Sequence, residues 1–172
     1  MTDFPRPATD EYAPFFAGYV AEVPEGDALD LLRHQADTMV AILRSLPAAQ
    51  WRHRYAPGKW SVAEVLGHIT DAERIFVYRA LRIARGDQTP LASFDENAYM
   101  PAAGFDERAP AGLLAEYVAV REATLALFRG LPAGAGDRRG VASGAGVSVR
   151  ALLYIIAGHE RHHLRILHER YL

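Results

Sequence analysis

The 172-residue chain contains no cysteine, and this absence removes several classes of protein at once. Without thiolates it cannot be a disulfide scaffold, a thiolate zinc finger, an iron–sulfur protein or an enzyme with a cysteine nucleophile. Any metal site in this chain has to use imidazole and carboxylate ligands instead. If the chemistry needs a thiol, that thiol has to arrive on a small molecule.

An excess of charge of one sign and long apolar runs are also missing. The 19 lysines and arginines against 21 acids give a formal charge of −2, so no basic face is expected for nucleic-acid phosphates. The first ten residues lack the basic start and apolar run of a signal peptide, and no run of about 18 apolar residues suggests a membrane span. We therefore expect a cytoplasmic protein with no nucleic-acid or membrane partner.

Hydrophobic residues make up 50% of the chain, and their spacing is helical, without convincing strand alternation. The apolar periodicity predicts four long helices, over residues 27–46, 61–85, 110–131 and 148–171. Polar residues at the helix starts agree with this reading. Ser61 and Glu64 have the spacing of a capping box, Ser148 can cap the last helix, and Pro110 suits a first-turn position.

The connections between these helices differ in length and composition. Residues 47–60 end in turn-forming residues, whereas residues 86–109 are long enough for a crossover and for a short helical turn at 94–100. Residues 132–147 are rich in glycine and alanine, which predicts a mobile loop. Aromatic residues within 12–23 predict a short amphipathic helix that packs on the bundle or on a partner.

Together these features predict an all-α fold in one domain over residues 1–172. The expected architecture is an antiparallel four-helix bundle with a long crossover between the second and third helices. We expect residues 1–26 to form an N-terminal extension that packs on the bundle.

The seven histidines separate by their angular positions on the predicted helices. With about 100° of rotation per residue, His159 and His163 lie at the centre of the apolar stripe of the last helix, and His68 lies at the edge of the stripe on the second. His162 falls on the flank of its stripe. The remaining three are expected at the surface: His34, His53 and His168.

Buried histidines one helical turn apart favour a metal site. Single core histidines are usually satisfied by hydrogen bonds, but two adjacent neutral imidazoles are costly to bury unless one partner satisfies both. A divalent cation does so, and residues at i and i+4 project from the same helix face. His159 and His163 are therefore candidate ligands, and His68 is the best placed third ligand.

Two further polar residues, Glu73 and Arg121, fall within the apolar faces and have two possible roles. Glu73 and Arg121 can form a buried ion pair that fixes the register of neighbouring helices. Alternatively, Glu73 orients a ligand imidazole, and Arg121 or Arg79 anchors an anion at the mouth of a cavity. His162, on the flank, is a fourth candidate for contact with the ligands or the substrate.

Residues 159–163 match the H-E-x-x-H pattern of zinc proteases, in which the glutamate activates water. The remainder of that pattern is missing. Only nine residues follow His163, and the extended metzincin spacing would need glycine at Ile166 and histidine at Glu169. The match does not indicate a conventional zinc protease.

Three motifs resemble the DinB-like superfamily, and its YfiT-like branch most closely: YAPGKWSV at 55–62, VLGHITDAER at 65–74 and AGHERHHL at 157–164. The resemblance implies a four-helix bundle with a crossover, commonly a homodimer. It also implies a divalent metal, zinc or nickel, held by His68, His159 and His163.

The resemblance further implies a function in detoxification or stress response. Some members of the superfamily resemble metal-dependent transferases or isomerases that use a low-molecular-weight thiol such as bacillithiol or mycothiol. For this chain we expect transfer of such a thiol to an electrophilic small-molecule substrate. The alternatives are a metal-dependent hydrolase and a non-catalytic, metal-stabilised dimeric bundle. A three-histidine metal with open positions can activate either water or a thiol.

Overall fold

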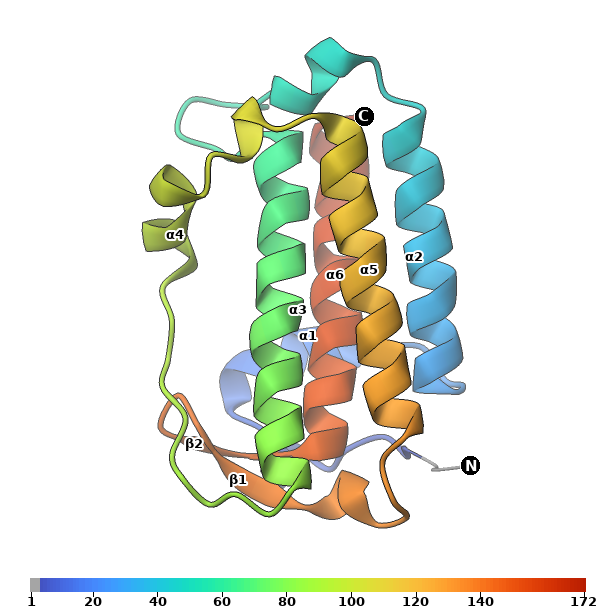
Figure 1. Cartoon of the computed structure of the whole chain (residues 1–172), viewed down its shortest axis with the longest axis vertical. Helices are drawn as coiled ribbons and strands as arrows, with labels where there is room; N and C mark the ends of the chain where they lie inside the picture. Colours follow the sequence, from blue (N-terminus) through green and yellow to red (C-terminus); the bar gives the residue numbers. More distant parts are fainter. Residues whose placement is uncertain (1–3) are drawn as a thin grey trace.

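Four long helices form the bundle that the apolar periodicity predicts. The computed structural model describes residues 4–172 and contains α2 (Ala28–Arg44), α3 (Val62–Ala84), α5 (Pro110–Arg129) and α6 (Val149–Arg170). α3 packs against α5 and α6, and α2 packs against the same two helices (Figure 1). The four-helix bundle is confirmed, with helix ends close to the expected positions.

Side-chain caps stabilise the starts of three of these helices: Asp27 caps α2, Ser61 caps α3 and Ser148 caps α6. The Ser61 hydroxyl accepts a hydrogen bond from the Glu64 amide at 3.1 Å, and the Glu64 carboxylate accepts one from the Ser61 amide at 2.8 Å. This is the predicted capping box, which satisfies two amides that lack partners within α3. Ser148 caps α6 in the same way, accepting from the Ala151 amide at 3.0 Å.

The long connection between α3 and α5 is a crossover along the outside of the bundle (Figure 1). It contains α4 (Glu96–Ala103), near the expected helical turn, and the 3-10 turn η4 (Phe105–Glu107). Because the chain returns to the end at which α3 began, α3 and α5 run in the same direction. The shorter α2–α3 connection contains η3 (Ala48–Arg52).

The predicted mobile loop at 132–147 is wrong, because this segment contains a small two-stranded sheet within the otherwise helical fold. After η5 (Ala135–Asp137), strands β1 (Arg139–Ala142) and β2 (Ala145–Ser148) pair as an antiparallel hairpin beneath the bundle (Figure 1). Ser143 and Gly144 form its two-residue turn with φ of 53° and 78°. Positive φ at both positions matches the right-handed twist of paired strands.

The hairpin depends on tertiary contacts, so the hydrophobic pattern of the sequence does not predict it. Its strands have four residues each and mostly small side chains, so their alternation is weak. The crossover adds to the hairpin, because the Leu91 amide donates to the Val141 carbonyl at 2.9 Å and the Ser143 amide donates to the Leu91 carbonyl at 3.0 Å. The segment is ordered by residues distant in the sequence.

The part of the N-terminal extension that the structure describes lies on α6; residues 1–3 lie outside the described residues. The extension contains η1 (Thr9–Glu11), η2 (Pro14–Phe16) and α1 (Ala17–Glu22). α1 approaches α6 so closely that a Cβ atom on Gly158 would lie 1.9 Å from the Tyr19 carbonyl oxygen. Only glycine permits this contact between the two backbones.

A buried carboxylate ties η1 to the start of α6. The Glu11 side chain, which is 1% exposed, accepts hydrogen bonds from the Ser148 hydroxyl at 2.7 Å and from Arg150 Nε at 2.8 Å. The hydrogen bonds from Arg150 are the main reason why the pKa of Glu11 is lowered to about 2.

Within residues 4–172, no helix has both the length and the hydropathy needed to cross a membrane.

We expect Gly158→Ala to reduce the free energy of unfolding by about 2 kcal/mol or more, because the added methyl group displaces α1 from α6. Urea denaturation measures this change. Gly18→Ala is the matched control, since nothing lies within 4 Å of a Cβ at that position, and it should be neutral or slightly stabilising. Equal stability of the two variants would contradict the close packing of α1.

The low pKa of Glu11 predicts a pH-dependent contribution to stability. Because its pKa is about 2 in the folded protein and 4.5 for a free side chain, the contribution is complete above pH 4.5 and disappears as the pH falls toward 2. Glu11→Gln should therefore lose about 2–3 kcal/mol at pH 7. Unfolding curves of both proteins should converge near pH 2.

The control for this comparison is Glu25→Gln. Glu25 makes an exposed ion pair with Arg6 at 3.5 Å, and such pairs contribute roughly 0–1 kcal/mol. A constant difference between wild type and Glu11→Gln from pH 7 to pH 2 would show that the ionised carboxylate is not what stabilises the N-terminal segment.

Candidate metal centre

Three imidazoles meet where α3 and α6 lie side by side. His68 projects from α3, and His159 and His163 project one turn apart from α6. The His159 Nε2 atom is 2.9 Å from His68 Nε2 and 3.1 Å from His163 Nε2. One nitrogen from each of the three residues lies within 4.8 Å of the others, so the cluster could hold a metal ion.

Burial keeps these rings neutral. His68 and His159 are each 6% exposed, and His163 is half-buried. Burial lowers the pKa of His68 to about 4 and that of His163 to about 3, and it lowers the pKa of His159 well below 6.5. At neutral pH all three rings are therefore uncharged, which is the state that binds a metal.

The donor set fits a divalent cation. A neutral imidazole has one N–H donor and one acceptor nitrogen, so the central Nε2 of His159 cannot pair optimally with both neighbours. With Zn–N bonds of about 2.0–2.1 Å, two imidazole nitrogens would lie roughly 3.3 Å apart in a tetrahedral site and roughly 2.9 Å apart in an octahedral one. The spacings of 2.9 and 3.1 Å are close to these values.

Aromatic rings surround the cluster. The Trp60 ring lies 4.8 Å from the His68 ring, and the His159 ring has Tyr19 at 5.4 Å and Phe76 at 6.0 Å, measured between centroids. These rings reduce the exposure of the imidazoles to water. No local pattern in the sequence places Tyr19 beside His159, because Tyr19 reaches the site only through the docking of α1 on α6.

A cavity of about 370 Å³ opens beside the cluster, and both His68 and His159 line it. Its walls include Phe16 and Tyr19 from the N-terminal extension and Phe94 from the crossover. Ser143 closes part of it from the hairpin turn. The cavity thus gives two of the three histidines access to a volume that suits a small molecule.

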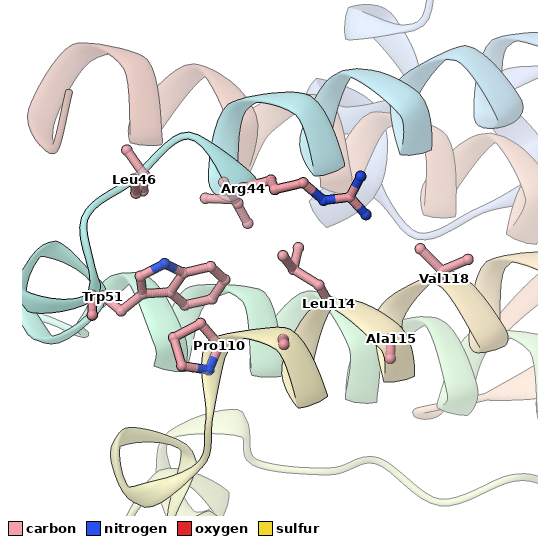
Figure 2. Close-up of a pocket in the computed structure, with 10 residues that line it drawn as sticks. Arg44, Leu46, Trp51, Pro110, Leu114, Ala115 and Val118 are labelled. Carbon is pink, nitrogen blue, oxygen red and sulfur yellow. The ribbon is translucent and has the colours of Figure 1, made fainter.

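A larger hollow, of about 570 Å³, lies elsewhere, between the end of α2 and the start of α5 (Figure 2). Its lining consists of apolar side chains such as Trp51 and Leu114, together with Arg44. None of its ten lining residues is a histidine or an acid. Chemistry rather than volume therefore identifies the smaller cavity as the candidate site.

Glu73 and Arg121 form the ion pair that was one of the two sequence interpretations. Arg121 on α5 is 1% exposed, and its Nε and Nη2 donate to the two Glu73 carboxylate oxygens at 2.9 and 2.8 Å. Nη2 also pairs with Glu160, to which the Tyr117 hydroxyl donates as well. Nη1 donates to the Leu32 carbonyl at 2.6 Å. Both oxygens of Glu73 are thus engaged by Arg121 rather than by an imidazole.

The position of Glu160 explains why the H-E-x-x-H match is misleading. Its carboxylate is 1% exposed and bonded to Arg121 and Tyr117, so it is not placed to activate water beside His159. Consecutive helical residues differ by about 100°, so His159 and Glu160 face different surroundings. The apolar run just before them, Leu152 to Ala157, signals a helix buried on all sides and could have indicated a buried Glu160.

The remaining predicted residues occupy different positions. Arg79 lines the cavity with His68 and His159. His162 is half-buried outside the cluster, with its ring 5.2 Å from that of His163 and its Nδ1 atom 3.7 Å from Glu22. The other three histidines are exposed, as expected: His34, His53 and His168.

We expect Arg121→Leu to lower the free energy of unfolding by about 3–5 kcal/mol, because it leaves two buried carboxylates without their cation. Urea denaturation at pH 7 tests this. Arg74→Leu is the control, since Arg74 pairs at the surface with Asp71 at 3.3 Å and Glu116 at 2.7 Å and should contribute about 1 kcal/mol or less. Similar losses in both variants would contradict a central structural role for Arg121.

Comparison with solved structures identifies the same fold. YfiT from Bacillus subtilis, described as a probable metal-dependent hydrolase with an unusual four-helix bundle topology, has a TM-score of 0.75 at 19% identity, over 92% of this chain and 91% of that one. A mycothiol-dependent maleylpyruvate isomerase has a TM-score of 0.68 at 15% identity, over 84% of this chain but 61% of its own. At such identities the likeness establishes the fold alone.

Comparison of sequences identifies the family. No curated protein sequence gives a significant match. The family profile of the DinB superfamily, however, matches residues 31–167, which span the bundle from α2 to α6 and include all three clustered histidines. The chain therefore belongs to the DinB superfamily.

Proposed function

We propose that this protein is a metal-dependent enzyme in which His68, His159 and His163 hold a divalent ion. The proposed reaction joins a low-molecular-weight thiol to an electrophilic small molecule. The observation that carries this proposal is the convergence of three neutral imidazole nitrogens beside a cavity of about 370 Å³. Zinc and nickel are the proposed ions, since both accept imidazole ligands.

The ion and the protein would make different contributions. A divalent cation held by three imidazoles with open positions supplies the Lewis acidity that lowers the pKa of a water or a thiol. The chain itself fixes the three imidazoles on two packed helices. The rings of Tyr19, Trp60 and Phe76 pack against these imidazoles and limit the access of water to them. Such preorganisation keeps the reacting groups in position.

In the thiol reaction, the sulfur forms a bond to an electrophilic carbon while the leaving group departs with its bonding electron pair. The thiol proton passes to solvent. Because the chain has no cysteine, the sulfur nucleophile has to be a cosubstrate. The structural likeness to an isomerase that depends on mycothiol supports this choice.

A metal-dependent hydrolase is the second candidate. It is favoured by the coverage of the YfiT structure, because the likeness extends over 91% of that chain, against 61% of the isomerase. A non-catalytic, metal-stabilised homodimer is a third candidate, but the cavity beside the histidines argues against a purely structural site. The three candidates make different predictions about turnover.

Metal content and turnover should change together in a histidine variant. Wild type and His34→Ala, which alters an exposed histidine, should each contain about one divalent ion per chain by elemental analysis. His159→Ala should lose the ion, because only two imidazoles remain. Conjugation of 1-chloro-2,4-dinitrobenzene with mycothiol or bacillithiol should occur only in the metal-containing proteins.

The same assays separate the alternatives. Thiol transfer that persists after chelation, or in His159→Ala, would refute the metal-dependent mechanism. Metal-dependent cleavage of 4-nitrophenyl acetate without added thiol would favour the hydrolase. Loss of thermal stability on chelation, with no turnover of either substrate, would favour the structural site.

A further inference from the structure

Arg79 is a buried cation that has no acidic partner within 4.0 Å among residues 4–172. Its side chain is 3% exposed, and burial lowers the pKa of its guanidinium, although an arginine remains charged at neutral pH. Its Nη2 atom donates to the Ala92 carbonyl at 2.7 Å and to the Ser143 hydroxyl at 3.0 Å, and both acceptors are uncharged. This contrasts with Arg121, which pairs with two carboxylates.

Arg79 lines the same cavity as His68 and His159 of the histidine cluster. Arg79 follows His68 by eleven residues on α3, which places the two within about 20° of the same helix face. The Arg79 guanidinium lies over the ring of Phe76, about one turn nearer to His68, as is usual for long side chains on a helix. The cavity therefore has a cation toward one end of α3 and the imidazoles toward the other.

Phenyl rings connect these two ends. The guanidinium carbon lies 5.8 Å from the centre of the Phe76 ring and 5.7 Å from that of Phe94. The Phe76 ring is in turn 6.0 Å from the His159 ring. The distance from the Arg79 guanidinium carbon to the centre of the His159 ring therefore cannot exceed the sum of these two distances to the Phe76 ring. One small molecule can bridge such a distance.

We propose that Arg79 binds a carboxylate of the substrate, and that the substrate combines this group with a flat apolar body. The body lies against the phenyl rings, and the opposite end reaches His68 and His159. The assignment of the reactive end rests on the proposed function, whereas the assignment of the anionic end does not. A charged hydrogen bond of this kind is strengthened by the low dielectric of a buried site.

Two polar side chains near Arg79, Ser143 and Glu96, also line this cavity. Arg79 links the crossover at Ala92 with the hairpin turn at Ser143, but neutral acceptors would be served equally well by an uncharged amide donor. Glu96 is half-buried where it lines the cavity. Burial is the main reason why the pKa of Tyr19 is raised, and the charge of Glu96 adds to this effect. Variants at Ser143 and Glu96 therefore serve as matched controls.

The test compares cinnamate with cinnamamide, which have nearly the same shape but differ in charge. Isothermal titration of the 172-residue chain as purified should give at least roughly tenfold tighter binding of cinnamate. Arg79→Gln should remove this preference. Any attraction between the carboxylate and a bound metal is present in both proteins, so the change in the affinity ratio isolates Arg79.

Ser143→Ala removes one hydrogen bond of Arg79 but keeps its charge, so the preference for cinnamate should persist. Glu96→Gln removes a carboxylate from the cavity wall and should leave the preference unchanged or increase it. Equal binding of acid and amide to wild type, or a preference that survives Arg79→Gln, would overturn the proposal. Loss of the preference in Ser143→Ala would also overturn it, because the tether would then be responsible.

A second measurement covers the case in which Arg79→Gln fails to fold. In a crystal structure of wild type with cinnamate, the carboxylate should lie within hydrogen-bond distance of the Arg79 guanidinium, and any other position would overturn the proposal. Both readouts measure binding. If the proposed metal-dependent reaction were absent, metal content and turnover would fail while the preference for cinnamate remained.

Discussion

The arrangement of the bundle depends on the ion pairs and hydrogen bonds that the buried Arg121 guanidinium makes. The guanidinium lies on α5 and pairs with Glu73 from α3 and Glu160 from α6, and it also donates to the Leu32 carbonyl on α2. One buried cation on α5 thus contacts the other three long helices. Because a buried charge without its partner is strongly destabilising, the rotation of α3 and α6 about their axes is restricted to orientations that keep both carboxylates on Arg121.

This restriction also orients the histidines. His159 directly precedes Glu160 on α6, and His68 lies five residues before Glu73 on α3. When the two carboxylates face Arg121, the imidazoles of His68 and His159 face each other on another side of the same helices. The ion pairs of Arg121 with Glu73 and Glu160 are therefore distinct from the candidate metal centre. The rigid helices α3 and α6 nevertheless couple the positions of the two sets of side chains.

Segments outside the long helices complete the cavity. The extension brings Tyr19 against His159, where Gly158 permits the backbone of α1 to approach α6. The hairpin turn brings Ser143 to Arg79, and the crossover adds Phe94. A bundle alone would expose the histidines on an open face, whereas these three segments give them a bounded space. The two buried arginines differ for the same reason: Arg121 is surrounded by helices that supply carboxylates, while Arg79 faces segments that supply neutral oxygens.

The sequence by itself determined the four helices, their caps, the crossover and the set of three inward histidines, because helical periodicity and i, i+4 spacing are local properties. Only the tertiary structure decided the rest. The hairpin is stabilised by pairing with Leu91 from the crossover, and Glu160 points to Arg121 because of how α5 packs. From the sequence, Arg79 and Arg121 were alternative candidates for one role, that of an anion anchor at the mouth of a cavity. Their difference depends on which groups from distant segments surround each guanidinium, and no local pattern encodes that.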